Sequence, residues 1–386
     1  MGVLVCFIAG TDLNLAPAEH VDATLVSVPW CIKTKSSIKN TLKLFEILKT
    51  KYRMLDSGGF QIYKIENKKP EIIYKNGKPE AVLNRDQIVY EPHKDVYQKN
   101  KFNLTPFHTV ETAQALGADF MHSLDYPLPH SKVPGEQKYQ FMRAAYYNAK
   151  NAETTGLLRE RVCPDVKFLL PVQAYTLRQF DEFMGLVGTK VIIDGPSLPI
   201  RNHDIADVCL FLVRFYQMDF RTVHILGTSK FWLIAVLAYF ARNYFDFSSF
   251  DACSWRDAAR VEEYLEPYTL YPITIKDNNL NLAKMDIKCE CPWCSYKSSF
   301  LDILDQPYDD KFSFLRRHNW WVINQATREF HDHAASPLTL KNFLMEKAWK
   351  RKKEIDELFR CLLIVDININ RRIEVLKAML KKSERI

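Results

Sequence analysis

Short apolar runs recur along this chain, and a small or polar residue follows most of them. Between the runs lie stretches whose apolar residues repeat every three to four positions, which is the period of an α-helix. The runs span residues 24–28, 52–55, 119–124, 167–172, 190–193, 222–226 and 249–250, and residues 1–10 predict one more strand. The helical stretches span residues 37–50, 105–116, 137–156, 177–186, 205–217 and 231–240. Strands that alternate with helices predict a parallel sheet with right-handed crossovers.

The number of runs favours a closed (β/α)8 TIM barrel, an α/β fold, over an open doubly wound sheet. Seven runs fall between residues 24 and 250, which is about the span of one barrel. No glycine-rich dinucleotide fingerprint follows any of them, and this weakens the open-sheet alternative. In a barrel, the polar residues at the carboxyl ends of the strands all face one end, where barrel enzymes have their active sites.

The domain organisation follows from where the alternation stops. We expect the barrel over residues 1–285, a zinc-binding subdomain over 286–335, and helices packed on the barrel over 336–386. Residues 66–100 interrupt the alternation within the barrel. There, Lys75-Asn76-Gly77-Lys78 is typical of a two-residue hairpin turn. We expect a β-excursion over the barrel mouth in this segment.

Composition and charge narrow the function classes. The chain has 386 residues, 47% of them apolar and 26% charged, which is typical of a globular protein. The net charge of +7 permits a polyanionic partner without requiring one. The longest apolar run, residues 231–240, is about half of a bilayer span, so we expect no membrane segment. Nine cysteines, scattered except for one trio, favour a reducing compartment, and we expect a cytoplasmic location.

The cysteine trio predicts a metal site. Cys289, Cys291 and Cys294 form a C-x-C-x2-C pattern, and three thiolates so close in sequence can surround one tetrahedral Zn²⁺. A structural zinc site needs a fourth ligand. We predict His318 for this position, with His331 as the reserve. Four protein ligands leave no open position for a reactive water, so the predicted zinc is structural.

Basic and aromatic residues in the C-terminal part leave two questions open. Arg316 and Arg317 beside His318 could grip phosphate or have no such role, whereas we expect Trp320-Trp321 to pack the zinc subdomain onto the barrel. Basic residues also gather over residues 347–353 and 371–382. For these we favour a solvated helix face over phosphate contact.

The segment Asp56-Ser57-Gly58-Gly59-Phe60-Gln61 follows a predicted strand. Two adjacent glycines let the backbone approach a flat ligand closely and leave N–H groups for binding. Phe60 could stack on a base and Asp56 is placed for acid–base work, although a tight turn with an aspartate cap is the alternative. The segment resembles the Asp-Ser-Gly-Gly-Phe-Gln signature of the tRNA-guanine transglycosylases, zinc-bearing barrels that exchange guanine for a 7-deazaguanine in a polynucleotide.

Further segments carry the same resemblance in the same order along the chain. Asp125, within His122-Ser123-Leu124-Asp125-Tyr126-Pro127, matches the aspartate with which the family recognises the base. Val172-Gln173 resembles the segment whose glutamine reads the carbonyl oxygen of the base. Phe250-Asp251 resembles the segment of the family's nucleophile, and Arg256 lies near the position of its arginine.

The remaining matches concern the walls of the base pocket and the metal. Leu226-Gly227 matches the pair that closes the face of the base opposite Phe60. Asp194-Gly195-Pro196 is a reduced counterpart of a glycine-rich strand end that donates an N–H group to the base. The resemblance implies substrate contacts from Ser57, Gly59, Phe60, Asp125, Gln173, Gly195, Leu226, Gly227 and Arg256, and zinc ligation by Cys289, Cys291, Cys294 and His318.

The implied reaction explains why these residue types are present. Breaking a glycosidic bond creates oxocarbenium character at the anomeric carbon, which a carboxylate can capture covalently, and this role falls to Asp251. The incoming 7-deazaguanine must lose its N9 proton, so a second carboxylate, Asp56, acts as general acid/base. Asp125 would accept hydrogen bonds from N1–H and the 2-amino group, and Gln173 would donate to the 6-oxo group. Each group left unpaired would cost about 1–3 kcal/mol, which excludes adenine.

The chain departs from the tRNA enzymes at two places. Ala174-Tyr175 follow Gln173 where the family has glycine, and residues 252–257 replace the Pro-Thr-Arg run after the nucleophile. We interpret these changes as favouring the DNA-acting branch, which places derivatives such as preQ0 into DNA, over a tRNA enzyme. The competing classes are a non-catalytic nucleic-acid-binding relative and an enzyme that hydrolyses the bond with water. Whether the chain forms a homodimer stays open.

Overall fold

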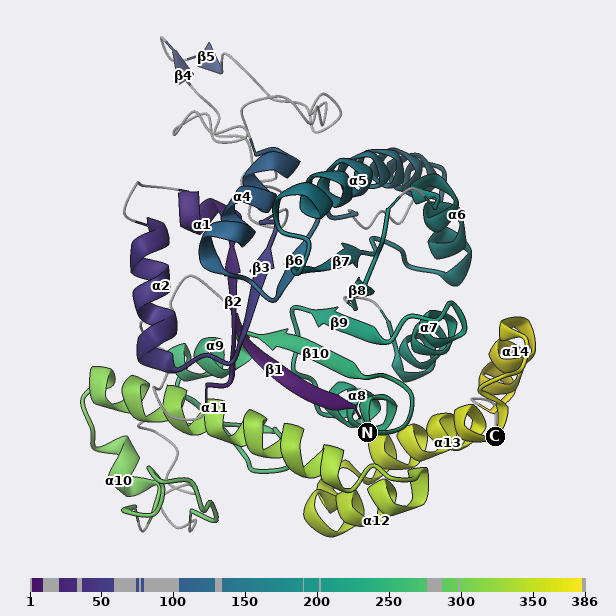
Figure 1. Cartoon of the computed structure of the whole chain (residues 1–386). Helices are drawn as coiled ribbons and strands as arrows, with labels where there is room; N and C mark the ends of the chain where they lie inside the picture. Colours follow the sequence, from purple (N-terminus) through teal and green to yellow (C-terminus); the bar gives the residue numbers. More distant parts are fainter. Residues whose placement is uncertain are drawn as a thin grey trace.

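Eight parallel strands close into a barrel in the order β1-β10-β9-β8-β7-β6-β3-β2, which confirms the predicted fold class (Figure 1). This computed structural model describes residues 2–9, 21–32, 37–58, 74–75, 78–79, 104–128, 134–189, 191–200, 203–275, 287–297 and 299–383. The barrel strands are β1 (Val3–Ala9), β2 (Ala23–Ser27), β3 (Tyr52–Asp56), β6 (Phe120–His122), β7 (Lys167–Pro171), β8 (Gly195–Pro199), β9 (Thr222–Leu226) and β10 (Phe247–Ala252).

Helices cover the outside of the barrel (Figure 1). They are α1 (Val28–Ile32), α2 (Ser37–Leu48), α4 (Pro106–Leu116), α5 (Pro134–Val162), α6 (Leu177–Val187), α7 (Ile205–Gln217), α8 (Phe231–Asn243) and α9 (Ser254–Arg260). Helix α4 shows how the sequence sets these ends. Thr105 is its N-cap, Pro106 opens its first turn, and Gly117 ends it in the left-handed region at φ 57°.

Helix α8 contains the longest apolar run of the sequence, and its side chains from Phe231 to Ala241 are buried. Later helices explain this burial, because α11 (Tyr308–Asp332) and α13 (Lys352–Asn368) pack on its outer side, away from the barrel (Figure 1). A helix that is apolar all round needs protein on every side. Among the described residues, no helix combines the length and the apolar character needed to cross a membrane.

One predicted strand is wrong. Of the run 190–193, the described residues 191–193 are not a strand, because β8 begins at Gly195. Arg159 of α5 explains the difference, since its guanidinium donates to the carbonyl of Ile192 at 3.1 Å and to the carboxylate of Asp194 at 3.2 Å. The segment is therefore held as a connection at the amino end of the barrel, although its composition is β-prone.

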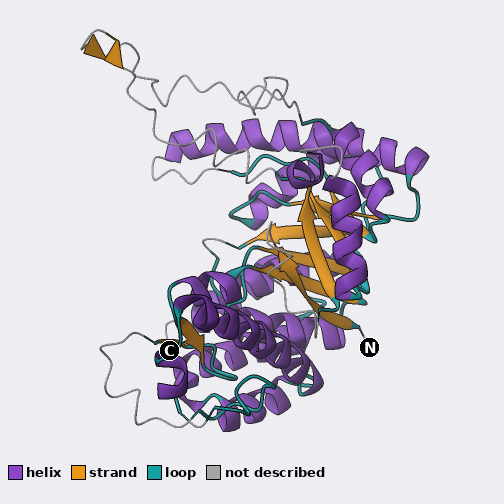
Figure 2. Cartoon of the chain, turned by 90° about the vertical axis from the view of Figure 1, so that its left-hand side faces the viewer, coloured by secondary structure: helices purple, strands orange, loops and turns teal. Residues whose placement is uncertain are grey.

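The C-terminal part packs against one side of the barrel (Figure 2). It contains the antiparallel pair β11 (Glu263–Leu265) and β12 (Pro272–Thr274), then α10 (Leu301–Leu304), α11, α12 (Pro337–Lys347), the 3-10 helix η4 (Trp349–Arg351), α13 and α14 (Ile373–Ser383). Trp320 of α11 is fully buried, with its ring centroid 5.9 Å from that of Trp255 on α9. The predicted packing role is therefore confirmed for Trp320.

Two other predictions concern short segments, the hairpin within residues 66–100 and the basic run 347–353. Strands β4 (Tyr74–Lys75) and β5 (Lys78–Pro79) pair antiparallel, as the predicted hairpin requires, and the two turn residues between them lie outside the described residues. The rest of the predicted β-excursion lies outside the described residues. In the basic run 347–353, Arg351 is not simply solvated, because its guanidinium lies 3.9 Å from the ring centroid of Tyr271 and contacts Glu354 at 2.7 Å.

Candidate active site

Three aspartates meet at the carboxyl end of the barrel strands. Asp56 is the last residue of β3, Asp251 lies near the end of β10, and Asp125 follows β6 by three residues. Because the strands are parallel and closed into a barrel, these positions share one rim. The charges of Asp125 and Asp251 both act on Asp56, so the two carboxylates assigned to chemistry lie within electrostatic reach of each other.

Asp56 is held by neighbours on two segments. Its Oδ2 accepts hydrogen bonds from the Ser27 hydroxyl at 3.0 Å and from the Gly58 N–H at 3.2 Å. Gly58 can present that N–H because it adopts φ 81°, which favours glycine. Burial raises the pKa of Asp56 to about 7, and the negative charges of Asp125 and Asp251 add to the shift. A carboxyl with this pKa can both donate and accept a proton near neutral pH.

Asp251 is oriented through one of its oxygens. Oδ1 accepts a 2.7 Å hydrogen bond from the backbone N–H of Gly227, which follows β9. The same oxygen lies 3.3 Å from Nε2 of His224, and the Asp251 side chain is 11% exposed. No described residue donates a hydrogen bond to Oδ2. One oxygen is therefore anchored, and the other is left for a ligand.

Asp125 is fixed by a pair of polar side chains. The Ser57 hydroxyl donates to Oδ1 at 2.5 Å, and Nε2 of Gln173 donates to Oδ2 at 2.7 Å. The Gln173 amide is itself oriented, because its Oε1 accepts from the N–H of Leu128 at 3.1 Å. Asp125 and Ser57 are buried. The arrangement places an acceptor and an amide donor side by side, as recognition of a base edge requires.

One predicted site residue lies elsewhere. Gly195 is the first residue of β8, at the opposite end of the barrel, where an added Cβ would lie 2.1 Å from the backbone oxygen of Thr222. This glycine therefore serves strand packing and is not brought to the aspartates. Leu226 ends β9 directly before Gly227, and Arg256 of α9 pairs with Asp257 at 3.1 Å. Gly59 and Phe60 lie outside the described residues.

Two histidines beneath the aspartates were not predicted from the sequence as site residues. His122 ends β6 and His224 lies in the middle of β9, and both are fully buried. Their ring centroids are 5.3 Å apart. Alternation along β9 could have located His224, since its side chain points to the same side of the strand as that of Leu226, a predicted site residue. A lone buried histidine carries no other signal in the sequence.

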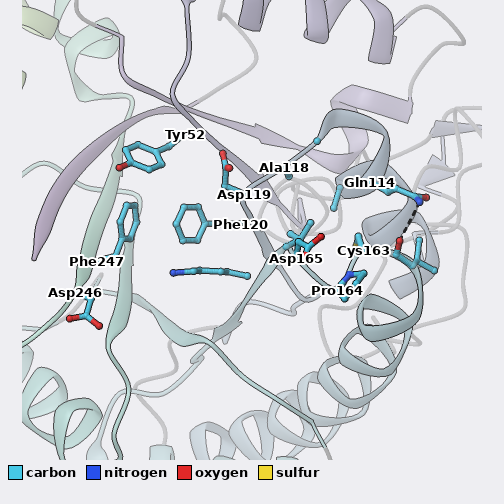
Figure 3. A pocket seen from close by; sticks show the side chains of 15 residues that line it. Tyr52, Gln114, Ala118, Asp119, Phe120, Cys163, Pro164, Asp165, Asp246 and Phe247 are labelled. Carbon is cyan, nitrogen blue, oxygen red and sulfur yellow. Dashed lines mark hydrogen bonds between the residues drawn. The ribbon is translucent and has the colours of Figure 1, made fainter.

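The opposite end of the barrel has a pocket of about 680 Å³ (Figure 3). The rings of Tyr52, Phe120 and Phe247 lie together there, and those of Phe120 and Phe247 stack at 4.6 Å between centroids. Residues at this end begin the strands, and in barrels this end contributes to stability rather than to catalysis. The aromatic rings form the floor below the histidines and aspartates.

The cysteine trio and His318 come together, as the sequence analysis predicted. Their ligand atoms all lie within 4.8 Å of one another, so the group could hold a metal ion. Nε2 of His318 lies 2.9 Å from the carbonyl oxygen of Leu265, which directs Nδ1 toward the cysteines. Hydrogen bonds from Cys289 and Cys294 lower the pKa of the Cys291 thiol to about 4. The reserve ligand His331 lies elsewhere, with its Nε2 3.0 Å from the backbone oxygen of Gly2.

Comparison with family models and with curated proteins finds no match for this chain. The function therefore has to be inferred from the site itself: three carboxylates of different environment on one rim of a barrel, with a separate cysteine–histidine cluster.

Proposed function

We propose that this protein is a base-exchange transglycosylase, a pentosyltransferase that replaces guanine in a nucleic acid with a 7-deazaguanine derivative. The observation that carries the proposal is the contrast between two carboxylates at one rim. Burial and neighbouring charges raise the pKa of Asp56 to about 7, whereas Asp251 is anchored through Oδ1 with Oδ2 available to a ligand. Two carboxyl groups in different environments are what acid–base and nucleophilic roles require.

The exchange has two steps, and Asp56 regains in the second step the proton that it donates in the first. In the first, Oδ2 of Asp251 attacks C1′ of the sugar, the glycosidic bond breaks, and guanine leaves with the proton that Asp56 donates. In the second, Asp56 takes the N9 proton of the incoming 7-deazaguanine, whose nitrogen attacks C1′ and releases the Asp251 carboxylate. The enzyme regains its starting protonation state. A covalent glycosyl intermediate of this kind divides one difficult displacement into two easier ones.

Asp125 and Gln173 supply the selectivity for the base. A guanine-type edge presents the N1–H and 2-amino donors to Asp125 and the 6-oxo acceptor to the Gln173 amide. The amide of Gln173 has two N–H groups, so it can donate to Asp125, as it does in this structure, and to the base as well. Ser57 holds the other oxygen of Asp125. The pair is pre-organised, which lowers the entropy cost of binding the base.

For the polymer we favour DNA, with tRNA as the alternative. The support is the sequence that surrounds the site, where Ala174-Tyr175 and residues 252–257 depart from the pattern of the tRNA enzymes. In either polymer the target base must leave the stack, at a cost of a few kcal/mol in a duplex. The incoming base of the proposal is a preQ0-like 7-deazaguanine.

We further propose that the metal of the cysteine cluster is a structural Zn²⁺. Sγ of Cys289, Cys291 and Cys294 lies 3.6, 3.5 and 3.4 Å from Nδ1 of His318. A tetrahedral zinc with Zn–S near 2.3 Å and Zn–N near 2.05 Å separates S and N by about 3.6 Å, so the donor set fits. The four residues would hold the ion, which would join the segment of residues 289–294 to α11.

The test is base exchange with defined components. The full chain is incubated with radiolabelled guanine and either DNA or tRNA, and acid-precipitable label is counted. We expect label in DNA, and we expect Asp251→Ala to abolish incorporation while preserving the thermal unfolding midpoint within a few degrees. Label only in tRNA would select the alternative polymer.

Other outcomes point to the competing classes. Abasic sites without incorporated label would indicate hydrolysis by water. Binding of DNA or tRNA without incorporation or abasic sites would indicate a non-catalytic relative. Near-normal exchange by the Asp251→Ala variant would refute the nucleophile assignment.

A further inference from the structure

Two buried histidines lie directly beneath the carboxylates, and base exchange as described above does not use them. His122 and His224 come from β6 and β9, which β7 and β8 separate in the barrel, and their ring centroids lie 5.3 Å apart with planes at 42°. Each ring faces one aspartate. Nδ1 of His122 lies 3.8 Å from Oδ1 of Asp56, and Nε2 of His224 lies 3.3 Å from Oδ1 of Asp251.

The two rings are sealed from solvent. Both histidines are 0% exposed, and the ring of Phe7 from β1 closes the space below His224 in an edge contact at 6.0 Å. Neither nitrogen of His122 has a hydrogen-bond partner with good geometry among the described residues, and the same holds for Nε2 of His224. A buried polar atom without a partner costs about as much as a lost hydrogen bond, so native proteins keep few of them. Of these three nitrogens, Nδ1 of His122 and Nε2 of His224 each lie beside a carboxylate of the proposed reaction.

The hydroxyl of Ser249 decides the tautomer of His224. Its Oγ lies 2.9 Å from Nδ1 of His224 but 3.5 Å from its other acceptor, the carbonyl of Val223. The shorter contact favours the hydroxyl as donor to Nδ1, which places the imidazole hydrogen on Nε2. Nε2 is the ring nitrogen beside Asp251, at 3.3 Å from Oδ1, the same oxygen that receives the Gly227 N–H, although the contact is not aligned as a hydrogen bond. Ser249, His224 and Asp251 thus lie in a row, with the carboxylate next to the ring nitrogen that carries the hydrogen.

His122 lies beside Asp56, as His224 lies beside Asp251. Burial lowers its pKa well below the usual value for histidine, and the neighbouring His224 adds to this effect. The ring is therefore neutral, and its one N–H can face Oδ1 of Asp56 without cancelling the charge of that carboxylate. Among the titratable neighbours of these rings, Asp56 is affected by the charges of Asp125 and Asp251, and Cys6 of β1 is affected by that of Asp251.

We propose that His224, set by Ser249, is a positioning residue that holds Oδ1 of Asp251 so that Oδ2 faces the sugar, and that His122 does the same for Asp56. This assignment deepens the proposed base exchange and rests on it for its kinetic consequences. Neither histidine touches the substrate. Replacing either histidine should therefore lower the rate of the covalent step and leave the affinity for the base unchanged. The reason is that a small misplacement of a reacting group slows a reaction by about 100-fold.

The kinetic arm compares three variants with a control. We expect His224→Leu to lower the kcat of exchange by about 100-fold with KM for the base unchanged. His224→Gln should recover most of that loss, since its amide N–H can replace Nε2–H. His122→Leu should move the alkaline limb of the pH–rate profile, which reports Asp56. The control is His331→Leu, a half-buried histidine that contacts the backbone of Gly2. Unchanged kcat in His224→Leu would overturn the proposal.

The second arm does not depend on catalysis. In the full chain labelled with [15N]histidine, we expect the His224 ring at pH 7.5 to be protonated at Nε2 alone and the His122 ring to be neutral. Asp251→Asn should shift the His224 signals, which are identified by their loss in His224→Leu. If the wild-type protein fails to exchange bases but shows these signals, the proposed base exchange is wrong, whereas the positioning roles of His122 and His224 stand. An active wild type whose His224 carries its hydrogen on Nδ1, or carries two, would overturn the positioning roles alone.

Discussion

The backbone N–H of Gly227 donates a 2.7 Å hydrogen bond to Oδ1 of Asp251 across the neighbouring strands β9 and β10. Gly227 adopts φ 75°, so its N–H points along the rim instead of continuing the strand ladder. The bond leaves Oδ2 as the oxygen directed to a ligand. It also joins two residues that the sequence resemblance assigns to different roles, base contact and nucleophile.

Replacing that glycine tests whether the N–H matters. No heavy atom lies within 4 Å of a Cβ added at Gly227, so Gly227→Ala strains only the backbone, by about 1–2 kcal/mol of unfolding free energy in chemical denaturation. Gly117→Ala is the control, since Gly117 has φ 57° at the end of α4 and an added Cβ there would lie 3.5 Å from Nη1 of Arg53, an ordinary contact. We expect similar losses of stability in both variants but at least tenfold slower covalent-intermediate formation in Gly227→Ala alone, because relaxation of the strained backbone turns the N–H away from Asp251. Equal rates would show that the positive φ of Gly227 is not needed to orient Asp251.

The raised pKa of Asp56 predicts how stability depends on pH. Its folded pKa of about 7 lies above the ordinary value of 3.8, so the folded protein holds the proton more tightly than the unfolded chain. This contribution is present below pH 4 and is lost as the pH rises through 7. Asp56→Asn removes the charge, and we expect it to raise the unfolding free energy at pH 8 by about 2–4 kcal/mol relative to wild type. Denaturant titrations at pH 4 and pH 8 measure this, and an equal difference at the two pH values would contradict the assignment.

The same group predicts the pH dependence of the first chemical step. In the proposed exchange, Asp56 is protonated when guanine is released, so single-turnover formation of the covalent intermediate should fall about tenfold per pH unit above pH 7. Rapid-quench experiments with labelled DNA between pH 5.5 and 9 would follow it. A flat profile would remove Asp56 from the role of general acid.

Gln173 is expected to govern discrimination between bases. Gln173→Leu removes the amide that holds Asp125 and that would donate to the 6-oxo group. The selectivity for guanine over adenine should drop by about 10- to 100-fold, the value of one buried hydrogen bond. Competition between labelled bases measures the ratio. Gln114→Leu is the control, because this α4 glutamine binds the carbonyl of Val162 at the opposite end of the barrel (Figure 3).

The cysteine cluster predicts a metal content. Elemental analysis by mass spectrometry should find one zinc per chain in the wild type and none in His318→Ala, with a lower thermal unfolding midpoint in the variant because zinc binding contributes folding free energy. His331→Ala should keep the zinc, since that ring contacts the backbone of Gly2. Full zinc occupancy in His318→Ala would exclude His318 as a ligand.

Asp194 should matter for stability and not for base binding. Its Oδ2 accepts from the Phe168 N–H at 2.7 Å and from the buried guanidinium of Arg159 at 3.2 Å. Asp194→Ala leaves both donors without this partner and should cost about 2–4 kcal/mol of unfolding free energy. The exposed pair of Arg178 and Glu182 provides the comparison, and Glu182→Ala should cost less than about 1 kcal/mol. Similar losses in the two variants would contradict this account.

Much of the fold could be predicted because its determinants are local. The alternation of strand and helix periods located seven of the eight barrel strands, and Thr105-Pro106 marked a helix start that depends on neighbouring residues alone. The C-x-C-x2-C spacing likewise constrains three ligands within one short turn. The exception was the run 190–193. Its composition is β-prone, but Arg159 of α5 holds it outside the sheet through a hydrogen bond to the carbonyl of Ile192.

Only the tertiary structure decided what surrounds the aspartates. Ser57 binds an aspartate 68 residues away, and Ser249 binds a histidine 25 residues away. The raised pKa of Asp56 comes from burial and from the charges of Asp125 and Asp251, which belong to other segments of the chain. The sequence by itself determined most of the strands and helices and the cysteines of the cluster, because these follow from periods and spacings along the chain. The closure of the barrel decided which side chains share a buried layer, because burial and electrostatics act through space.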